Sequence, residues 1–348
     1  MNKQNPKIVF LGAGAIGGGV AGWIAPHYEN MYVMDRGPVS AALKKSGITT
    51  YLGNEPGKKE TAKVKVIDDL SEQKDADVLV ITVKNYDLEA AVKMAREKMG
   101  DNPVVVSMAN GALNQKLVPA SFSKVIFSVI SYNAWMDEPV VVGYQKKGPL
   151  VFGTPDNRLQ DEMKTVSDIF NRGVETVITD HLQDAVHSKI VINLTNSLTT
   201  LIGFSFREIT NFPVFQRLLT SLVWEGVEIV KANGYKECKL GGMPGWTLLM
   251  LAAKMPGFLM RPIFRGNVKK MVLSSMAQDV IQRKSKKNEL DTINGYIIEL
   301  ADKAGLKAPF NRTLYELCKR EFARPDFVTP ELKPMTVEAI WAEVQKKL

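Results

Sequence analysis

Apolar runs of strand length alternate with amphipathic helical patterns as far as residue 181. The strands that this pattern predicts are 7–11, 31–34, 77–82, 104–107 and 124–129, with helices at 15–24 and 87–98. Such alternation is typical of a doubly wound parallel sheet. Two further apolar runs, 139–144 and 150–153, lie so close in sequence that we expect an antiparallel pair at the sheet edge.

Beyond residue 181 the alternation stops and long amphipathic segments follow. They predict helices at 182–202, 213–233, 268–284, 289–304 and 312–324, a proline-marked connector at 328–334 and a terminal helix at 337–348. The expected α/β architecture is therefore an N-terminal Rossmann-type doubly wound sheet, residues 1–181, followed by an all-helical domain, residues 182–348.

The segment 241–264 is the most apolar part of the chain. Pro244 and Pro256, together with Lys254 and Arg261, interrupt it. A membrane-spanning helix needs about 20 mostly apolar residues without such breaks, so no membrane span is expected. We expect a buried helical hairpin or an oligomer contact, with a homodimer formed through the helical domain. Contact with a membrane surface is the alternative.

Charge and cysteine content narrow the class of protein. The formal net charge is +8, which favours anionic ligands, but the lysines are dispersed instead of forming one basic block, so no nucleic-acid partner is expected. The two cysteines, Cys238 and Cys318, and a polar stretch at residues 1–7 predict a cytoplasmic protein with buried thiols. The chain has no C-x-x-C or H-E-x-x-H motif, and no metal site is expected.

The first predicted strand ends directly in a glycine motif, G-x-G-x-x-G, which opens the first predicted helix. Gly12 permits a tight turn, Gly14 allows the backbone to approach a ligand, and Gly17 allows the helix to pack closely on the strand. This context predicts a dinucleotide site with the pyrophosphate at the helix N-terminus. The predicted phosphate-binding residues are Gly12, Ala13, Gly14, Ala15, Ile16 and Gly17.

Polar residues follow three of the predicted strands. Asp35 and Arg36 follow the second strand. At this position an acid binds the ribose hydroxyl of NAD, whereas an arginine binds the 2′-phosphate of NADP. Because both are present, the residues alone leave the choice of cofactor open. Lys84 and Asn110 follow two later strands, at the sheet edge where such folds bind ligands. A solvated lysine and an ordinary Asn-Gly turn are the alternatives for these two positions.

One lysine of the second half stands on an otherwise apolar helix. Lys189 and Asn193 are four residues apart and share a helix face. Desolvation, and the charge of Lys84 if the two converge, would lower the pKa of this lysine and suit it to donate a proton. The three histidines, His27, His181 and His187, lie in no motif that makes a better acid. Lys189 is therefore the candidate general acid.

In order along the chain, these motifs resemble the ketopantoate reductases (2-dehydropantoate 2-reductases) over residues 7–323. The matching elements are GAGAIGG, Arg36, VKNYD at 83–87, ANGAL at 109–113, K-x-x-x-N at 189–193, SSMAQD at 274–279 and NELDTINGY at 288–296. The resemblance implies NADPH-dependent reduction of a 2-oxo acid, most specifically 2-dehydropantoate to (R)-pantoate for pantothenate and coenzyme A synthesis. The small-molecule substrate would lie in a cleft between the two domains.

The resemblance also implies roles for individual residues. Lys189 resembles the family's general acid, and Glu289 the carboxylate that holds the substrate hydroxyl and positions the lysine. Arg36 resembles the 2′-phosphate reader, which favours NADPH. Lys84 resembles the lysine between cofactor and substrate. The substrate-orienting polar groups implied are Asn110, Asn193, Asn196 and Ser275, with Asn110 and Glu289 also near the cofactor.

Several positions depart from the family pattern. The second helix asparagine is Asn196, three residues after Asn193, where many relatives place it four after, so we expect one of Asn196 and Ser197 to face elsewhere. His187 stands where relatives often carry Trp, and the interval from Ser275 to Glu289 is longer by two residues. The departures keep two alternatives open: a related 2-hydroxy-acid or opine-type dehydrogenase, and a non-catalytic NADP(H) sensor.

Overall fold

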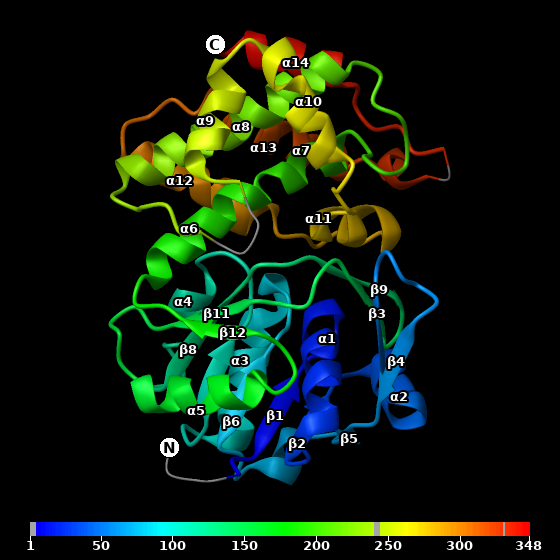
Figure 1. Ribbon diagram of the computed structural model, residues 1–348, viewed down its shortest axis with the longest axis vertical. Helices are drawn as coiled ribbons and strands as arrows, with labels where there is room; N and C mark the ends of the chain where they lie inside the picture. Colours follow the sequence, from blue (N-terminus) through cyan, green and yellow to red (C-terminus); the bar gives the residue numbers. More distant parts are fainter. Residues whose placement is uncertain (1–4, 240–243, 330) are drawn as a thin grey trace. The chain divides into compact units, whose positions relative to one another are not determined.

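The computed structural model describes residues 5–239, 244–329 and 331–348. The chain divides into two compact units, Met1–Gln183 and Asp184–Leu348 (Figure 1). Unit 1 combines sheets with helices, and the named elements of unit 2 are all helical among the residues described. This mixed α/β fold with a parallel sheet core and a helical second part confirms the predicted fold class.

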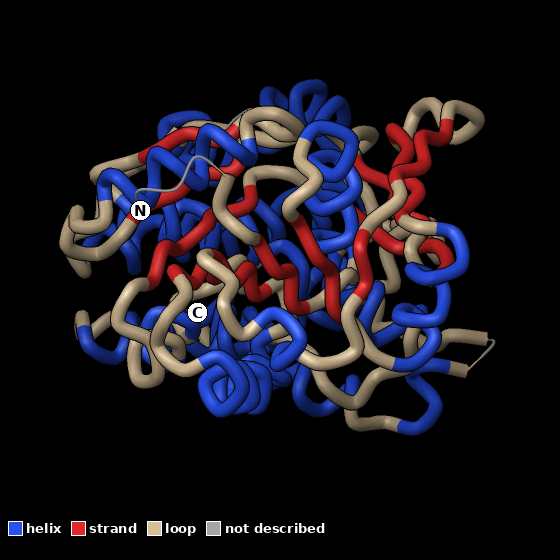
Figure 2. Tube along the Cα trace, turned by 90° about the horizontal axis from the view of Figure 1, so that it is seen from below, coloured by secondary structure: helices blue, strands red, loops and turns tan. Residues whose placement is uncertain are grey.

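The core of unit 1 is an eight-stranded sheet in the order β12-β11-β8-β7-β6-β1-β2-β5. Its strands are β1 (Ile8–Leu11), β2 (Met31–Met34), β5 (Lys65–Val66), β6 (Val78–Ile81), β7 (Val104–Ser107), β8 (Val125–Ile130), β11 (Leu150–Gly153) and β12 (Thr176–Ile178). Neighbours from β5 to β8 pair in parallel, and β11 runs antiparallel to β8. Figure 2 shows these strands twisted relative to one another. The five strands predicted at 7–129 are confirmed.

Every residue of β1, β6 and β7 is buried, as expected for strands with helices on both faces. The helical segments of unit 1 are α1 (Ala15–Ile24), η1 (Ala25–His27), α2 (Gly37–Ser46), η2 (Leu70–Gln73), α3 (Asn85–Met99), α4 (Asn114–Leu117) and α5 (Gln160–Phe170). Phe170 of α5 packs against Phe10 and Phe152 of the sheet, with ring centroids 6.0 and 5.3 Å apart.

A second sheet has four strands in the order β4-β3-β10-β9. Its strands are β3 (Ile48–Leu52), β4 (Lys59–Ala62), β9 (Ala134–Glu138) and β10 (Val141–Tyr144). The predicted antiparallel pair of 139–144 with 150–153 is therefore wrong. β10 pairs with β3 and β9, whereas β11 enters the large sheet. The reason is burial: all four residues of β11 are buried, and only the large sheet covers both of its faces.

Glycines of α1 bring this helix close to the small sheet. A Cβ at Gly22 would lie 2.9 Å from the Cγ2 of Ile48, and one at Gly18 would lie 3.4 Å from a methyl group of Val142. A larger residue at Gly22 would push β3 away. The small sheet therefore fixes the position of the helix that opens at the glycine motif.

Unit 2 follows from α6 (Leu182–Asn193), which begins at the end of unit 1. Its further helical segments are α7 (Thr195–Leu201), α8 (Phe212–Ala232), α9 (Trp246–Lys254), α10 (Gly257–Val268), α11 (Ser275–Ala277), η3 (Gln278–Gln282), η4 (Asp291–Gly295), α12 (Tyr296–Lys303), α13 (Pro309–Phe322), η5 (Pro325–Val328) and α14 (Val337–Gln345). Both η3 and η4 are π-helical. The helices predicted at 213–233, 312–324 and 337–348 are confirmed within a few residues.

Two predicted helices of unit 2 are interrupted. The segment 182–202 breaks at Leu194, because the hydroxyl groups of Thr195 and Ser197 donate to the carbonyls of Ile192 and Leu194 and compete with the regular helix. The prediction of one helix over 268–284 is wrong. α10 ends at Val268, and a new helix starts when the Ser274 hydroxyl accepts from the N–H of Ala277.

A buried carboxylate joins the long helix α8 to α13. Glu225 accepts hydrogen bonds from the backbone N–H groups of Phe310 and Asn311, at 3.0 and 2.7 Å, and from the Asn311 side chain at 2.8 Å. These bonds satisfy donors at the start of α13 that the helix cannot satisfy itself. Burial raises the pKa of Glu225 above its ordinary value despite these bonds.

The hairpin predicted over 241–264 forms as α9 and α10, with residues 241–243 outside those described. It is not buried within the chain: no residue of α9 is buried, and in α10 only Met260 and Phe264 are. In the part of the chain that the structure covers, no helix is long and apolar enough to cross a membrane. Both thiols were predicted to be buried. Cys318 is buried, as predicted, but Cys238 is half-buried.

Candidate active site

The glycine turn at the end of β1 is tightly packed. Gly12 has a φ of +105°, a conformation that favours glycine, and its N–H donates to Met34 O at 2.9 Å. Thr82 Oγ1 donates to Gly12 O at 2.7 Å. A Cβ at Gly17 would overlap both this carbonyl oxygen and the Thr82 hydroxyl. The turn, the start of α1 and the end of β6 therefore form one close contact.

Gly14 differs from these two glycines. It is the N-cap of α1 and provides no side-chain cap, so the first N–H groups of the helix keep their capacity to bind an anion. No atom lies within 4 Å of a Cβ built at Gly14. The protein itself therefore leaves room at this position, as a pyrophosphate approaching the backbone requires.

Asp35 supports the glycine turn. Its carboxylate accepts from the N–H of Ala13 at 2.5 Å and from the N–H of Arg36 at 2.6 Å. These bonds tie the end of β2 to the turn after β1 and occupy part of the acceptor capacity of the carboxylate. Arg36 itself is exposed at the N-cap of α2. The arginine is thus the residue of this pair that can reach outward.

Lys84 and Asn110 lie at the same edge of the sheet. Lys84 is half-buried and is the N-cap of α3, directly after β6, while Asn110 follows the neighbouring parallel strand β7. Asn85 Nδ2 donates to Asn110 O at 2.8 Å, and Asn114 Nδ2 donates to Ala109 O at 3.0 Å. Asn85 and Asn114 were not predicted from the sequence, and they fix the loop that carries Asn110.

In unit 2, the predicted lysine and asparagines follow one another on α6 and α7. Lys189 is half-buried and Asn193, the last residue of α6, is 7% exposed. Asn196 is half-buried in the first turn of α7, whereas Ser197 is fully buried and accepts from Asn294 Nδ2 at 3.1 Å. Ser197 is therefore the residue that faces the core, as expected for one member of that pair.

The predicted residues Ser275 and Glu289 lie on segments next to these helices. Ser275 is half-buried at the start of α11, which packs on α7, and Thr200 Oγ1 lies 3.3 Å from Ser274 Oγ. Glu289 is 3% exposed and precedes the π-helix η4 by two residues. A π-helical turn is rare and often marks a functional segment.

An aromatic cluster around a buried histidine, which the sequence did not reveal, starts two residues before the predicted acid. The ring of His187 is 1% exposed and stacks on Tyr235 at 3.4 Å between centroids, and its Nε2 lies 2.9 Å from the Tyr296 hydroxyl. Burial raises the pKa of Tyr296, and interactions with Tyr235 raise it further. This contact joins α6, two residues before Lys189, to the segment after η4.

Comparison with known proteins identifies the class. The family model described as ketopantoate reductase PanE/ApbA matches residues 8–157, and its C-terminal counterpart matches residues 181–321. The chain therefore belongs to the ketopantoate reductase family of NADP-dependent oxidoreductases.

Curated relatives agree with this assignment. A 2-dehydropantoate 2-reductase from Pyrococcus abyssi is 27% identical over 316 residues, which cover 90% of this chain and 97% of the relative. One from Archaeoglobus fulgidus is 26% identical over 315 residues, covering 90% and 97%.

Solved structures show the same fold. A PanE/ApbA family ketopantoate reductase from Ralstonia eutropha JMP134 superposes with a TM-score of 0.72 at 22% identity and covers 90% of this chain and 97% of its own. A D-mandelate dehydrogenase in a ternary complex with NADH and anilino(oxo)acetate has a TM-score of 0.74 at 19% identity, covering 91% and 98%.

Gly12 and Gly17 are tightly packed, whereas Gly14 is open, so substitution by alanine should have different effects at these positions. Gly14→Ala is expected to leave the thermal midpoint of the protein unchanged, because the added methyl group meets no atom, and to weaken NADPH binding at least tenfold. Gly17→Ala is expected to weaken NADPH binding and also to lower the thermal midpoint, because its methyl group would overlap the backbone oxygen of Gly12. Thermal unfolding and calorimetric titration with NADPH measure the two effects. Wild-type affinity in Gly14→Ala would contradict the assignment of the turn.

Proposed function

We propose that this chain reduces 2-dehydropantoate to (R)-pantoate with NADPH; its curated relatives are named 2-dehydropantoate 2-reductases. The observation that carries the proposal is the occurrence, in one family member, of the open glycine turn in unit 1 and the half-buried Lys189 with Asn193 in unit 2. Residues 1–181 would bind the cofactor and residues 182–348 the substrate.

The cofactor fits the residues of unit 1. The backbone from Gly12 to Gly17, with Ala13, Ala15 and Ile16, would hold the pyrophosphate at the N-terminus of α1. Arg36 would pair with the 2′-phosphate, and the bonds that Asp35 makes to the turn support this preference for NADPH over NADH. When bound, the nicotinamide supplies the hydride.

The proton comes from the chain itself in this proposal. As hydride reaches the substrate carbon, negative charge develops on the carbonyl oxygen, and the ammonium of Lys189 donates a proton to it. Glu289 would accept the hydroxyl of the substrate and hold the lysine Nζ in position. Its carboxylate is buried, which favours a fixed position over a solvated one.

The remaining polar groups would orient the substrate. Asn110, Asn193 and Asn196 offer amide donors and acceptors, and Ser275 a hydroxyl at the start of α11. Lys84 would stand between the cofactor and the substrate carboxylate. The buried position of Ser197 supports the choice of Asn196 as the second asparagine of the site.

Two further expectations belong to the same proposal. The chain works as a homodimer through the helical unit, for which a solution mass near twice 38.6 kDa would be the evidence. It acts in the cytoplasm, and two cysteines with free thiols, Cys238 and Cys318, support a reducing compartment.

Removal of the proposed acid tests the chemistry. Lys189→Ala is expected to lower kcat with 2-dehydropantoate about 10²- to 10⁴-fold, the usual contribution of a general acid. The Kd for NADPH should stay near the wild-type value, because the residue lies outside the cofactor-binding unit. The rate is followed as NADPH oxidation, with Lys231→Ala, an exposed lysine of α8, as the matched control.

An unchanged kcat in Lys189→Ala would remove this lysine as the acid. If the wild type binds NADPH but no 2-oxo acid causes its oxidation, the reductase proposal fails and the sensor alternative gains. A screen of 2-oxo acids with and without an amine co-substrate separates reductase from opine-type activity.

Cofactor choice gives a separate test. Arg36→Ala is expected to raise the KM for NADPH about 10- to 100-fold, since a charge-assisted hydrogen bond contributes about 1.5–3 kcal/mol. The KM for NADH should change little. Arg158→Ala is the matched control, because this exposed arginine follows the antiparallel strand β11, toward the opposite edge of the sheet. Equal effects on both cofactors would contradict the role of Arg36.

A further inference from the structure

The α9–α10 hairpin exposes five large apolar side chains. The exposed fractions are 66% for Phe258, 50% for Ile263, 49% for Leu259 and 38% each for Leu251 and Met255. We call these five residues the hairpin patch. Contiguous exposed apolar side chains of this size mark an interaction surface more often than a solvated one.

The helix α10 has two distinct faces. Met260 and Phe264, four residues apart, are buried, and the Phe264 ring packs against Phe212 and Phe215 of α8 at 5.5 and 5.8 Å. Leu259 and Ile263, also four apart, lie along a neighbouring strip of the helix and are exposed. Packing within the unit therefore covers the strip with Met260 and Phe264 and leaves the strip with Leu259 and Ile263 exposed.

The turn between the two helices is held firmly against the unit. Gln216 Nε2 of α8 donates to Gly257 O at 3.0 Å, and Trp246 N, at the start of α9, donates to Glu237 Oε1 at 2.8 Å. In Figure 1 the hairpin lies beside α8. The hairpin that carries the patch is therefore attached to the rest of unit 2 by hydrogen bonds at both of its helices.

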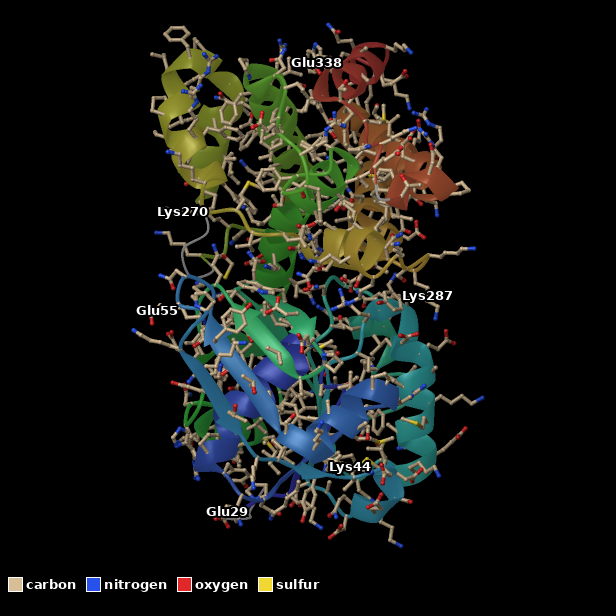
Figure 3. All side chains as sticks on the ribbon, turned by 90° about the vertical axis from the view of Figure 1, so that its right-hand side faces the viewer. Glu29, Lys44, Glu55, Lys270, Lys287 and Glu338 are labelled. Atoms are coloured by element: carbon tan, nitrogen blue, oxygen red, sulfur yellow. The ribbon has the colours of Figure 1, made fainter. Side chains whose placement is uncertain are left out.

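The charged residues within the hairpin segment itself have one sign. No Asp or Glu occurs between Glu237 and Asp279, whereas this interval contains Lys239, Lys254, Arg261, Arg265, Lys269 and Lys270. Lys254 has an acidic partner, Glu228, 3.9 Å away on α8. Among the described residues, no ion pair includes the half-buried Arg261, the exposed Lys269 or the exposed Arg265, whose guanidinium lies 5.2 Å from the Phe212 ring centroid. Figure 3 shows the labelled Lys270 side chain projecting outward beyond α10.

Apolar side chains on a segment whose own charged residues are all cations match the interface of an anionic lipid bilayer. The apolar residues can enter the boundary of the acyl chains while the cations meet lipid phosphates. A second copy of the chain fits less well, because a two-fold contact through the hairpin patch would bring together two segments that each carry only cations. The homodimer proposed above would then use other faces of the helical unit.

We propose that the hairpin patch and its flanking cations bind the surface of anionic membranes and hold the enzyme there peripherally. Both helices of the hairpin are too short to cross a membrane, and the described part of the chain contains no helix that could. This binding does not depend on the reductase assignment.

Sedimentation with lipid vesicles tests the proposal on the full-length protein. The wild type is expected to bind vesicles that contain phosphatidylcholine and phosphatidylglycerol. Its binding to vesicles of phosphatidylcholine alone should be at least tenfold weaker, and its binding to the anionic vesicles should weaken as the salt concentration rises. Phe258→Ser with Ile263→Ser, and separately Arg265→Gln with Lys269→Gln, should each reduce binding to anionic vesicles at least tenfold.

Matched controls keep the result specific. Phe206→Ser removes a phenylalanine that is 45% exposed elsewhere in unit 2, and Lys303→Gln with Lys307→Gln removes two exposed cations near α12. These controls should bind as the wild type does. All variants should keep the wild-type thermal midpoint and the kcat measured without lipid, since none touches the proposed active site.

Two outcomes would overturn the proposal. The first is no binding of the wild type to anionic vesicles, or binding by both patch variants that equals binding by the wild type. The second is a wild type that does not bind lipid, together with a change in the solution mass of the Phe258→Ser, Ile263→Ser variant. Light scattering would then show this mass fall from that of two copies to that of one. That result would assign the hairpin patch to self-association.

Discussion

The close contact of Gly17 with the carbonyl of Gly12 and the hydroxyl of Thr82 is the constraint on which unit 1 depends. It joins three elements that are distant in sequence: the end of β1, the start of α1 and the end of β6. Any side chain at Gly17 would separate them. Because the contact sets the direction of α1, it also sets where the N–H groups of that helix point, and through Asp35 the same turn is tied to β2.

Buried polar groups have an equivalent role in unit 2. The Asn294 amide bonds to Ser197, the Glu225 carboxylate holds the start of α13, and the Tyr296 hydroxyl meets His187. Each contact joins helices that apolar packing alone would hold with less definite orientation. The segment with Glu289 and the helix with Lys189 are thereby connected through residues that themselves need not touch a substrate.

The hairpin lies within the range that the second family model matches. The family models match most of the chain and account for the turn, the lysine helix and the segment with Glu289. In α10, Phe264 packs on α8, whereas Leu259 and Ile263 stay exposed, and it is these exposed residues for which we propose a membrane surface.

The sequence by itself determined the elements with local signals. Period and turn residues located β1, α1, α3 and α8, and the glycine spacing identified a turn whose φ and packing only glycine allows. Tertiary structure decided what depends on distant partners. β10 pairs with β3 and not with its sequence neighbour β11, the hairpin is exposed where a buried hairpin or an oligomer contact was expected, and Ser197 faces Asn294. Such choices follow from which surfaces remain to be covered once the chain is folded, and no local pattern contains that information.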